Sequence, residues 1–256
     1  MRFYPLDYYG EIYDKVKRHW TGDLEIGGLI VRRELLVGTQ DNKDMEICHT
    51  KVINPKNEKA KGQILFVHGY IENSDFWIEA GIQFALNDFE VHLLDLRGFG
   101  LSGGERASNS LFGFQADLEK LLQQMRKDLP LFISGHSAGG LTVLSSLVNN
   151  PKLEVAGVLI SASGFKSKEA SWDRRILLRL FGASLSIFNM RSTMKPQELV
   201  GDSREMLKIY SNPKACFNVH ITSYATILNT MDYLYANPKR FTKPIFFALG
   251  ERDRIV

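Results

Sequence analysis

The 256-residue sequence has little cysteine, with only Cys48 and Cys216. The two do not form a CxxC pair, so neither a disulfide framework nor a cysteine zinc site is indicated. No uninterrupted apolar run approaches the roughly 18 residues of a membrane-spanning helix, and residues 1–20 lack the apolar centre of a signal peptide. We therefore expect reduced thiols and, by default, a cytoplasmic location.

A strong charge bias is also absent, since 32 Lys and Arg residues stand against 29 Asp and Glu residues. The formal net charge is +3, and no Lys/Arg tract typical of nucleic-acid binding occurs. Nucleic acid is therefore not an expected partner, and nothing in the sequence requires a metal or an organic cofactor. No internal repeat is visible, and 44% hydrophobic residues suffice for one domain with a full core, residues 1–256.

Short apolar runs alternate with helical patterns from Gln63 onward, which is typical of a parallel sheet with right-handed crossovers. The expected strands are ILFV at 64–67, VHLLDL at 91–96, LFIS at 131–134, VAGVLIS at 155–161 and IFFAL at 245–249. Apolar residues at helical spacing predict helices over 114–125 and 141–147. The fold class is therefore α/β.

Two stretches depart from this alternation. Residues 28–37 and 44–53 are rich in β-forming residues and flank a polar stretch at 39–43, which predicts an antiparallel hairpin. Residues 163–213 separate two core strands by far more than a usual helix–strand connection. We interpret this long segment as a helical cap inserted over the active site.

The motif GHSAGG at 135–140 follows the LFIS strand and precedes an apolar helix, so GxSxG lies in a strand, turn, helix context. Small residues beside Ser137 permit a tight turn that raises its hydroxyl above the sheet. The helix N-terminus favours negative charge, and the Ala138 N–H would point at the oxyanion of a tetrahedral intermediate. We therefore predict Ser137 to be a nucleophile rather than an ordinary N-cap.

Two further residues complete this hypothesis. The second oxyanion-hole donor should come from the loop after an earlier strand, where VHGY at 67–70 makes the Tyr70 N–H the candidate. An acid is expected late in the chain, and Asp253 lies just past a strand end, where α/β active sites gather. Its role would be to orient a histidine and stabilise the charged imidazolium, and the alternative is a solvated turn aspartate.

With these motifs the sequence resembles the monoglyceride lipase and lysophospholipase branch of the α/β-hydrolases, also called the serine aminopeptidase domain, from about Gly28 to the last residue. The motifs that carry the resemblance are HG at 68–69 with Glu72, DLRGFGLSGGER at 95–106, GHSAGG, and GERDRIV at 250–256. It implies an α/β-hydrolase fold with a mostly parallel central sheet. The roles that it implies are Ser137 as nucleophile, Asp253 as acid, and Tyr70 and Ala138 as suppliers of the oxyanion-hole amides.

The sequence departs from the family pattern near the site. Ile71 is larger than the small residue often found there, and Asn73 stands where a histidine is common. Asp95 and the glycines after it are expected to form a tight structural loop beneath the active site.

In this family the base histidine follows the acid by about thirty residues, on a loop after one more strand. Here no histidine follows Asp253. The histidines present are His19, His49, His68, His92, His136 and His220. We expect His68 to fix the HG turn, His136 to point into neighbouring structure, and the others to be packing or surface residues. The sequence therefore predicts a C-terminally truncated α/β-hydrolase, without the final strand, helix and histidine loop, that is inactive as written. A natural relative without catalysis is the alternative.

The segment 172–188 of the expected cap is apolar and punctuated by arginines. It either packs the cap onto the core or forms an acyl-chain entrance that contacts a membrane surface peripherally. The family resemblance implies a serine hydrolase of acyl esters, acting on a small lipid ester such as monoacylglycerol or lysophospholipid through an acyl-enzyme. The alternatives are a peptidase, a thioesterase, an acyltransferase, or a non-catalytic binding protein.

Overall fold

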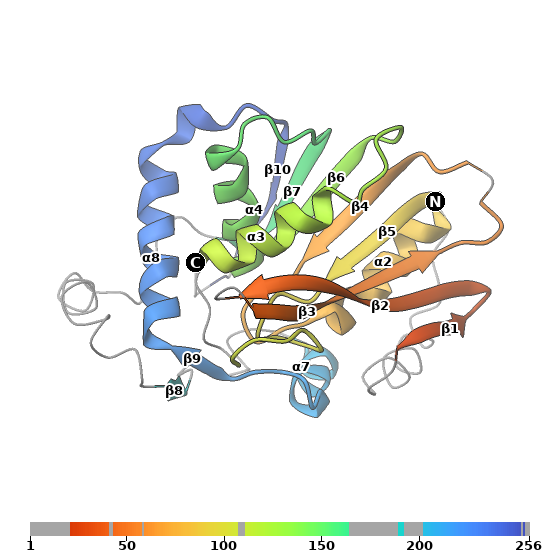
Figure 1. The fold of residues 1–256 in the computed structure, drawn as a ribbon, viewed down its shortest axis with the longest axis horizontal. Coiled ribbons are helices and arrows are strands. Elements are labelled where there is room, and N and C mark those ends of the chain that lie inside the picture. The colour runs from red at the N-terminus through yellow and green to blue at the C-terminus, as the bar shows by residue number, and fades with distance from the viewer. Residues whose placement is uncertain are drawn as a thin grey trace.

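The computed structural model describes residues 21–40, 43–57, 59–106, 111–163, 189–191, 202–251 and 253. Its main feature is an eight-stranded sheet in the order β1-β2-β3-β5-β4-β6-β7-β10 (Figure 1). The strands are β1 (Gly22–Ile26), β2 (Leu29–Gln40), β3 (Lys43–Ile53), β4 (Gly62–Val67), β5 (Phe89–Leu94), β6 (Leu131–His136), β7 (Gly157–Ser161) and β10 (Ile245–Ala248). The run from β5 to β10 is parallel, while β1, β2 and β3 pair antiparallel. The predicted mostly parallel α/β sheet is confirmed.

Helices cover both faces of this sheet (Figure 1). They are α2 (Ile78–Leu86), α3 (Leu111–Leu122), α4 (Ala138–Asn149) and α8 (Ile221–Ala236), with the short 3-10 helices η2 (Ser74–Trp77) and η3 (Pro238–Arg240). Residues of α3, α4 and α8 form one buried apolar cluster with the sheet, and residues of α2 form a second. Two cores on opposite faces explain why the central strands are apolar throughout rather than alternating.

The predicted hairpin is confirmed and is longer than the sequence indicated. Pairing continues to Gln40 and Lys43, so much of the polar stretch 39–43 is strand. Strand β1 was not predicted, because GDLEI has one buried side chain and lies at the sheet edge. An edge strand buries little apolar surface and so lacks a strong pattern.

The helix expected over 114–125 ends earlier than the apolar spacing indicated, since α3 stops at Leu122. Met125 is still buried in the larger core cluster, so its apolar character reflects burial rather than helix. The side chain of Gln63 bonds both the N–H and the C=O of Arg126, each at 2.8 Å. These bonds satisfy backbone groups that a continuing helix would have paired internally.

The expected cap at 163–213 lies mostly outside the described residues, including the apolar segment 172–188. Within it the structure describes Ser163, the strand β8 (Asn189–Arg191), which pairs with β9 (Asn218–His220), and α7 (Ser203–Ser211). Helix α7 lies at the end of the sheet toward which β4 and β5 run (Figure 1). Among the described helices, none has the length and hydropathy needed to cross a membrane.

Candidate active site

Ser137 occupies a strained turn between β6 and α4. Its backbone angles are φ 49° and ψ −119°, a left-handed conformation that costs a non-glycine residue of order 1–3 kcal/mol. The glycines around it are required by space, since a Cβ on Gly135 would lie 2.7 Å from the Gly140 Cα. The Ser137 side chain makes no capping hydrogen bond to α4. The turn thus has the shape expected of a nucleophile elbow, and the nucleophilic role of Ser137 stays a prediction.

The HG loop, defined here as residues 68–73, lies directly against this elbow. Val67 pairs with Gly135 in the parallel ladder of β4 and β6, so the two strands end at the same level of the sheet. A Cβ on Gly139 would lie 2.2 Å from the Val67 carbonyl oxygen, and one on Gly69 would lie 3.1 Å from the Ser137 Cβ. The structure therefore brings together the two segments whose amides were predicted to form an oxyanion hole.

The two predicted donors differ in their surroundings. Ala138 is buried and is the first residue of α4, where backbone N–H groups have no partner within the helix. Tyr70 packs its ring edge-on against Phe99, with centroids 4.9 Å apart. Burial raises the pKa of the Tyr70 phenol to about 12, against the effect of a hydrogen bond with Ser223. The Tyr70 side chain is thus packed in the core with its phenol neutral. The donor role of both amides stays a prediction.

Glu72 closes the HG loop, a role that the sequence did not reveal. Its Oε2 accepts hydrogen bonds from the Gly69 N–H at 2.8 Å and from the Trp77 indole N–H at 3.2 Å. Its Oε1 lies 3.6 Å from Nε2 of His136, the residue before the candidate nucleophile. The one sequence feature that points to this role is an acidic residue three positions after Gly69, whose backbone N–H needs a hydrogen-bond acceptor.

Two histidines near the site have structural contacts, as predicted. The Leu96 N–H donates to Nε2 of His68 at 3.0 Å, so Nδ1 carries the ring proton and donates to the Gly69 carbonyl at 2.7 Å. Burial lowers the pKa of His68, which favours this neutral form. Nδ1 of His136 lies 2.9 Å from the Ser161 hydroxyl.

His49 and His92 lie within the sheet and bond each other. In the part of the chain that the structure describes, no histidine side chain forms a hydrogen bond with the Ser137 hydroxyl. His19 and the side chain of His220 lie outside that part.

Asp253 follows β10 in a turn at the carboxyl end of the parallel strands, where the Ser137 elbow also lies. The register pairs Ser161 of β7 with both His136 and Ala248, so the elbow and the end of β10 lie at one level. Asp253 is half-buried, and its N–H donates to the Gly250 carbonyl at 3.1 Å. This position is compatible with the predicted acid, whose role stays a prediction.

Asp95 ties the glycine-rich loop, defined here as residues 95–106, to η2, which supports the structural role expected for it. Its carboxylate accepts from the Ser74 N–H at 2.6 Å and from the Leu101 N–H at 2.9 Å. A Cβ on Gly100, which has φ 54°, would lie 2.1 Å from this carboxylate. Burial alone would raise the pKa of Asp95, but the Arg33 guanidinium and these hydrogen bonds outweigh it and lower the pKa.

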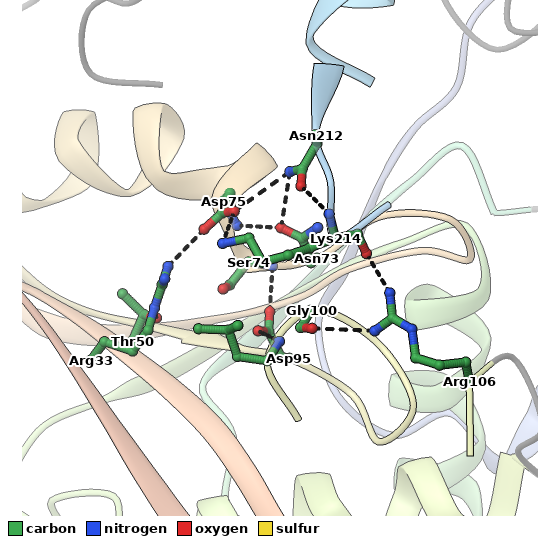
Figure 2. Close-up of polar contacts among 11 residues, drawn as sticks. Arg33, Thr50, Asn73, Ser74, Asp75, Asp95, Gly100, Arg106, Asn212 and Lys214 are labelled. Atoms are coloured by element: carbon green, nitrogen blue, oxygen red, sulfur yellow. Dashed lines mark hydrogen bonds and ion pairs between the residues drawn. The ribbon is translucent and has the colours of Figure 1, made fainter. Parts of the chain in front are cut away.

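A buried ionic network surrounds Asp75, two residues after the HG loop ends (Figure 2). Asp75 accepts from Arg33 Nη2 at 2.7 Å and forms an ion pair with Lys214. The side chains of Arg33 and Asp75 are 0% and 1% exposed. Burial raises the pKa of Asp75, and both cations oppose that rise. No sequence pattern indicated this cluster, because its members come from three distant segments.

No group of three or more His, Cys, Asp or Glu side chains among the described residues could hold a metal ion.

Comparison with known proteins finds a family of hydrolases and relatives named as an esterase and a lipase. Residues 58–256 match the family described as serine aminopeptidase, S33 (Hydrolase_4). Caffeoylshikimate esterase of Arabidopsis thaliana is 25% identical over 224 residues, 80% of this chain and 66% of that protein. Monoglyceride lipase of Homo sapiens is 27% identical over 211 residues, 76% of this chain and 66% of that protein. This chain thus spans just under two thirds of the length of each relative.

The solved structures agree on the fold. A soluble variant of monoglyceride lipase from Saccharomyces cerevisiae, crystallised in complex with a substrate analog, superposes with a TM-score of 0.75. The match covers 87% of this chain and 78% of that one, at 20% sequence identity. At this identity the likeness shows the α/β-hydrolase fold.

Proposed function

The chain belongs to the serine aminopeptidase (S33) family of hydrolases, and from this premise we propose that it hydrolyses acyl esters through Ser137. The observation that carries the proposal is the strained elbow, which holds Ser137 at the start of α4 so close to the HG loop that a Cβ on Gly69 would lie 3.1 Å from the Ser137 Cβ. Backbone strain retained at a serine with no capping role is a feature of functional sites.

In the proposed mechanism the Ser137 oxygen attacks the ester carbonyl carbon, and the amides of Tyr70 and Ala138 stabilise the oxyanion. The tetrahedral intermediate collapses, the alcohol leaves with a proton, and an acyl-enzyme remains. Water then attacks the acyl carbonyl and releases the carboxylic acid. A base must take the serine proton, and in the family pattern that role belongs to a histidine that follows the acid and that Asp253 would orient.

We propose a lipid ester, monoacylglycerol or lysophospholipid, as the substrate. One relative is named a monoglyceride lipase, and a structural neighbour of that name was crystallised with a substrate analog. Contact of the cap segment 172–188 with a lipid surface belongs to the same proposal, because its apolar residues and arginines match such a surface.

The first test uses a fluorophosphonate probe on the protein expressed from its complete gene. We expect the probe to label the wild type, Ser137→Ala to abolish labelling, and Ser211→Ala, a change on the exposed face of α7, to leave it intact. Hydrolysis of p-nitrophenyl butyrate, 2-oleoylglycerol and lysophosphatidylcholine would then rank the substrates. A wild-type protein that neither labels nor hydrolyses these esters would contradict the proposal and favour a non-catalytic binding protein.

A further inference from the structure

The segment from Asn212 to Cys216, which leads from α7 toward β9, is fastened to the HG loop by a backbone hydrogen bond. The Cys216 N–H donates to the Ile71 carbonyl at 3.1 Å, and both residues are buried. Ile71 has φ 76°, a conformation that is rare and costly for a β-branched residue. The hydrogen bond to its carbonyl therefore helps to retain a peptide orientation that the isolated loop would not favour.

Lys214 fastens the same segment a second time, through its side chain (Figure 2). Its ammonium group pairs with Oδ2 of Asp75, whose Oδ1 is held by Arg33. Asp75 belongs to η2, which begins directly after the HG loop, and its N–H donates to the Asn73 side chain at 3.0 Å. A charge-assisted contact among side chains this deeply buried is strong and geometrically selective.

Hydrogen bonds also fix the backbone of Lys214, so its side chain reaches Asp75 from one defined position. Its carbonyl accepts from Arg106 Nη2 at 2.8 Å, and Arg106 Nη1 donates to the Gly100 carbonyl at 3.2 Å (Figure 2). Its N–H donates to the Asn212 side chain at 2.8 Å. Lys214 thus connects the segment after α7 to both η2, which follows the HG loop, and the glycine-rich loop.

A second lysine of the same region supplies a matched comparison. Lys208 of α7 pairs with Glu79 of α2 and with Glu205, each at 2.9 Å. Glu79 belongs to α2 and Glu205 to α7, so these pairs join α7 to α2 and include no residue of the HG loop.

We propose that Lys214 is a positioning residue for ester hydrolysis, because its pair with Asp75 seats the 212–216 segment so that Cys216 holds the Ile71 carbonyl. The Tyr70 N–H lies in the peptide between Gly69 and Tyr70, two peptide units before the Ile71 carbonyl, so the backbone conformation of Ile71 constrains the path of the short loop that carries this N–H. The inference rests on the proposed function, which assigns that N–H to the oxyanion hole.

Loss of the ion pair would let Ile71 relax from its strained conformation and turn the Tyr70 N–H away from the oxyanion. Such a donor acts mainly in the transition state, so kcat should fall while KM changes little. Removal of one oxyanion-hole donor lowers kcat by roughly 10²–10³ in known hydrolases. A donor that is loosened rather than removed should cost about tenfold or more.

The test compares Lys214→Met, Lys214→Arg and Lys208→Met in the protein expressed from its complete gene. Steady-state hydrolysis of p-nitrophenyl butyrate, the rate of fluorophosphonate labelling, and Tm are measured for each. We expect Lys214→Met to lower kcat and the labelling rate at least tenfold with KM within about twofold, and Lys214→Arg to recover most of the loss. Lys208→Met should stay within about twofold of wild type. Equal kcat values for the two methionine variants would overturn the proposal.

A single buried carboxylate left without its lysine can prevent folding, so the double variant Asp75→Asn/Lys214→Met is included. It removes both charges of the pair and should remain folded with the same low kcat. A folded double variant with wild-type kcat would overturn the proposal. A wild type without Ser137-dependent hydrolysis would overturn the proposed function and this inference together. An active wild type whose kcat is unchanged by the Lys214 substitutions would overturn the inference alone.

Discussion

Nε2 of His49 lies 3.1 Å from Nδ1 of His92, and the two rings stack with their centroids 5.2 Å apart. The pair joins adjacent strands β3 and β5 within the sheet. Nδ1 of His49 lies 3.0 Å from Glu34, which also pairs with Lys51. Burial lowers the pKa of each histidine to about 3, with a smaller contribution from Lys51. Both rings are therefore neutral in the folded protein at physiological pH.

This pair predicts an acid-sensitive fold. The unfolded chain protonates these histidines near pH 6.5, whereas the folded protein does so near pH 3, so between these values the unfolded state binds more protons. Stability should therefore fall as pH falls through this window, by up to about 1.4 kcal/mol per pH unit for each histidine. Urea unfolding at pH 7, 6, 5 and 4 measures the slope. The variant His49→Phe/His92→Leu should have a shallower slope, and equal slopes would contradict the assignment.

Glu72→Gln tests the closure of the HG loop. The two hydrogen bonds that now converge on one carboxylate oxygen would be shared by a neutral amide, which is a weaker acceptor. We expect kcat for p-nitrophenyl butyrate to fall about tenfold, which corresponds to about 1.4 kcal/mol. Glu79→Gln on α2 is the matched control and should leave kcat within about twofold. Equal effects of the two changes would argue against a role for Glu72 in holding the loop.

The strain at Ser137 predicts that glycine is more stabilising than alanine at this position, the reverse of the usual order. At φ 49° glycine relieves the left-handed strain, so Ser137→Gly should unfold with a free energy about 1 kcal/mol higher than Ser137→Ala. The same two substitutions at Ser134, in the middle of β6, should give the opposite order, since glycine weakens a strand interior. Chemical denaturation of the four variants measures both differences. Ser137→Ala and Ser137→Gly of equal stability would show that the turn holds no such strain.

Arg97 and Asp117 form a buried pair that links the glycine-rich loop to α3. Two guanidinium nitrogens contact the carboxylate at 2.6 and 2.9 Å, and both side chains are less than 10% exposed. Arg97→Met leaves a buried carboxylate without its main partner and should destabilise the fold by about 3–5 kcal/mol. Arg32→Met removes a two-bond pair with Asp23 at 2.8 and 2.9 Å that is exposed, and should change the denaturation midpoint far less. Similar midpoint shifts would contradict the importance of burial.

The local features of the site could be predicted from the sequence because each depends on a short run of residues. GHSAGG after an apolar strand fixes a tight turn, and the structure places Ser137 there at φ 49°. The HG motif and the late turn around Asp253 follow strands that end at one edge of the sheet, as parallel pairing requires. The end of α3 was less well predicted, because Met125 is apolar through burial in the core and yet continues the helical spacing. The edge strand β1 was not predicted, because its single buried residue gives no apolar alternation.

By itself, then, the sequence determined the parallel α/β sheet and the identity and order of the candidate catalytic residues, because strand patterns and glycine-rich turns act over a few residues. Only the tertiary structure decided which charges meet beneath the surface. Arg33, Asp75 and Lys214 are each ordinary in their own segments, and the fold makes them one buried cluster beside the HG loop. Such contacts depend on how distant elements pack, which no local pattern records, so the support of the loop became visible only in three dimensions.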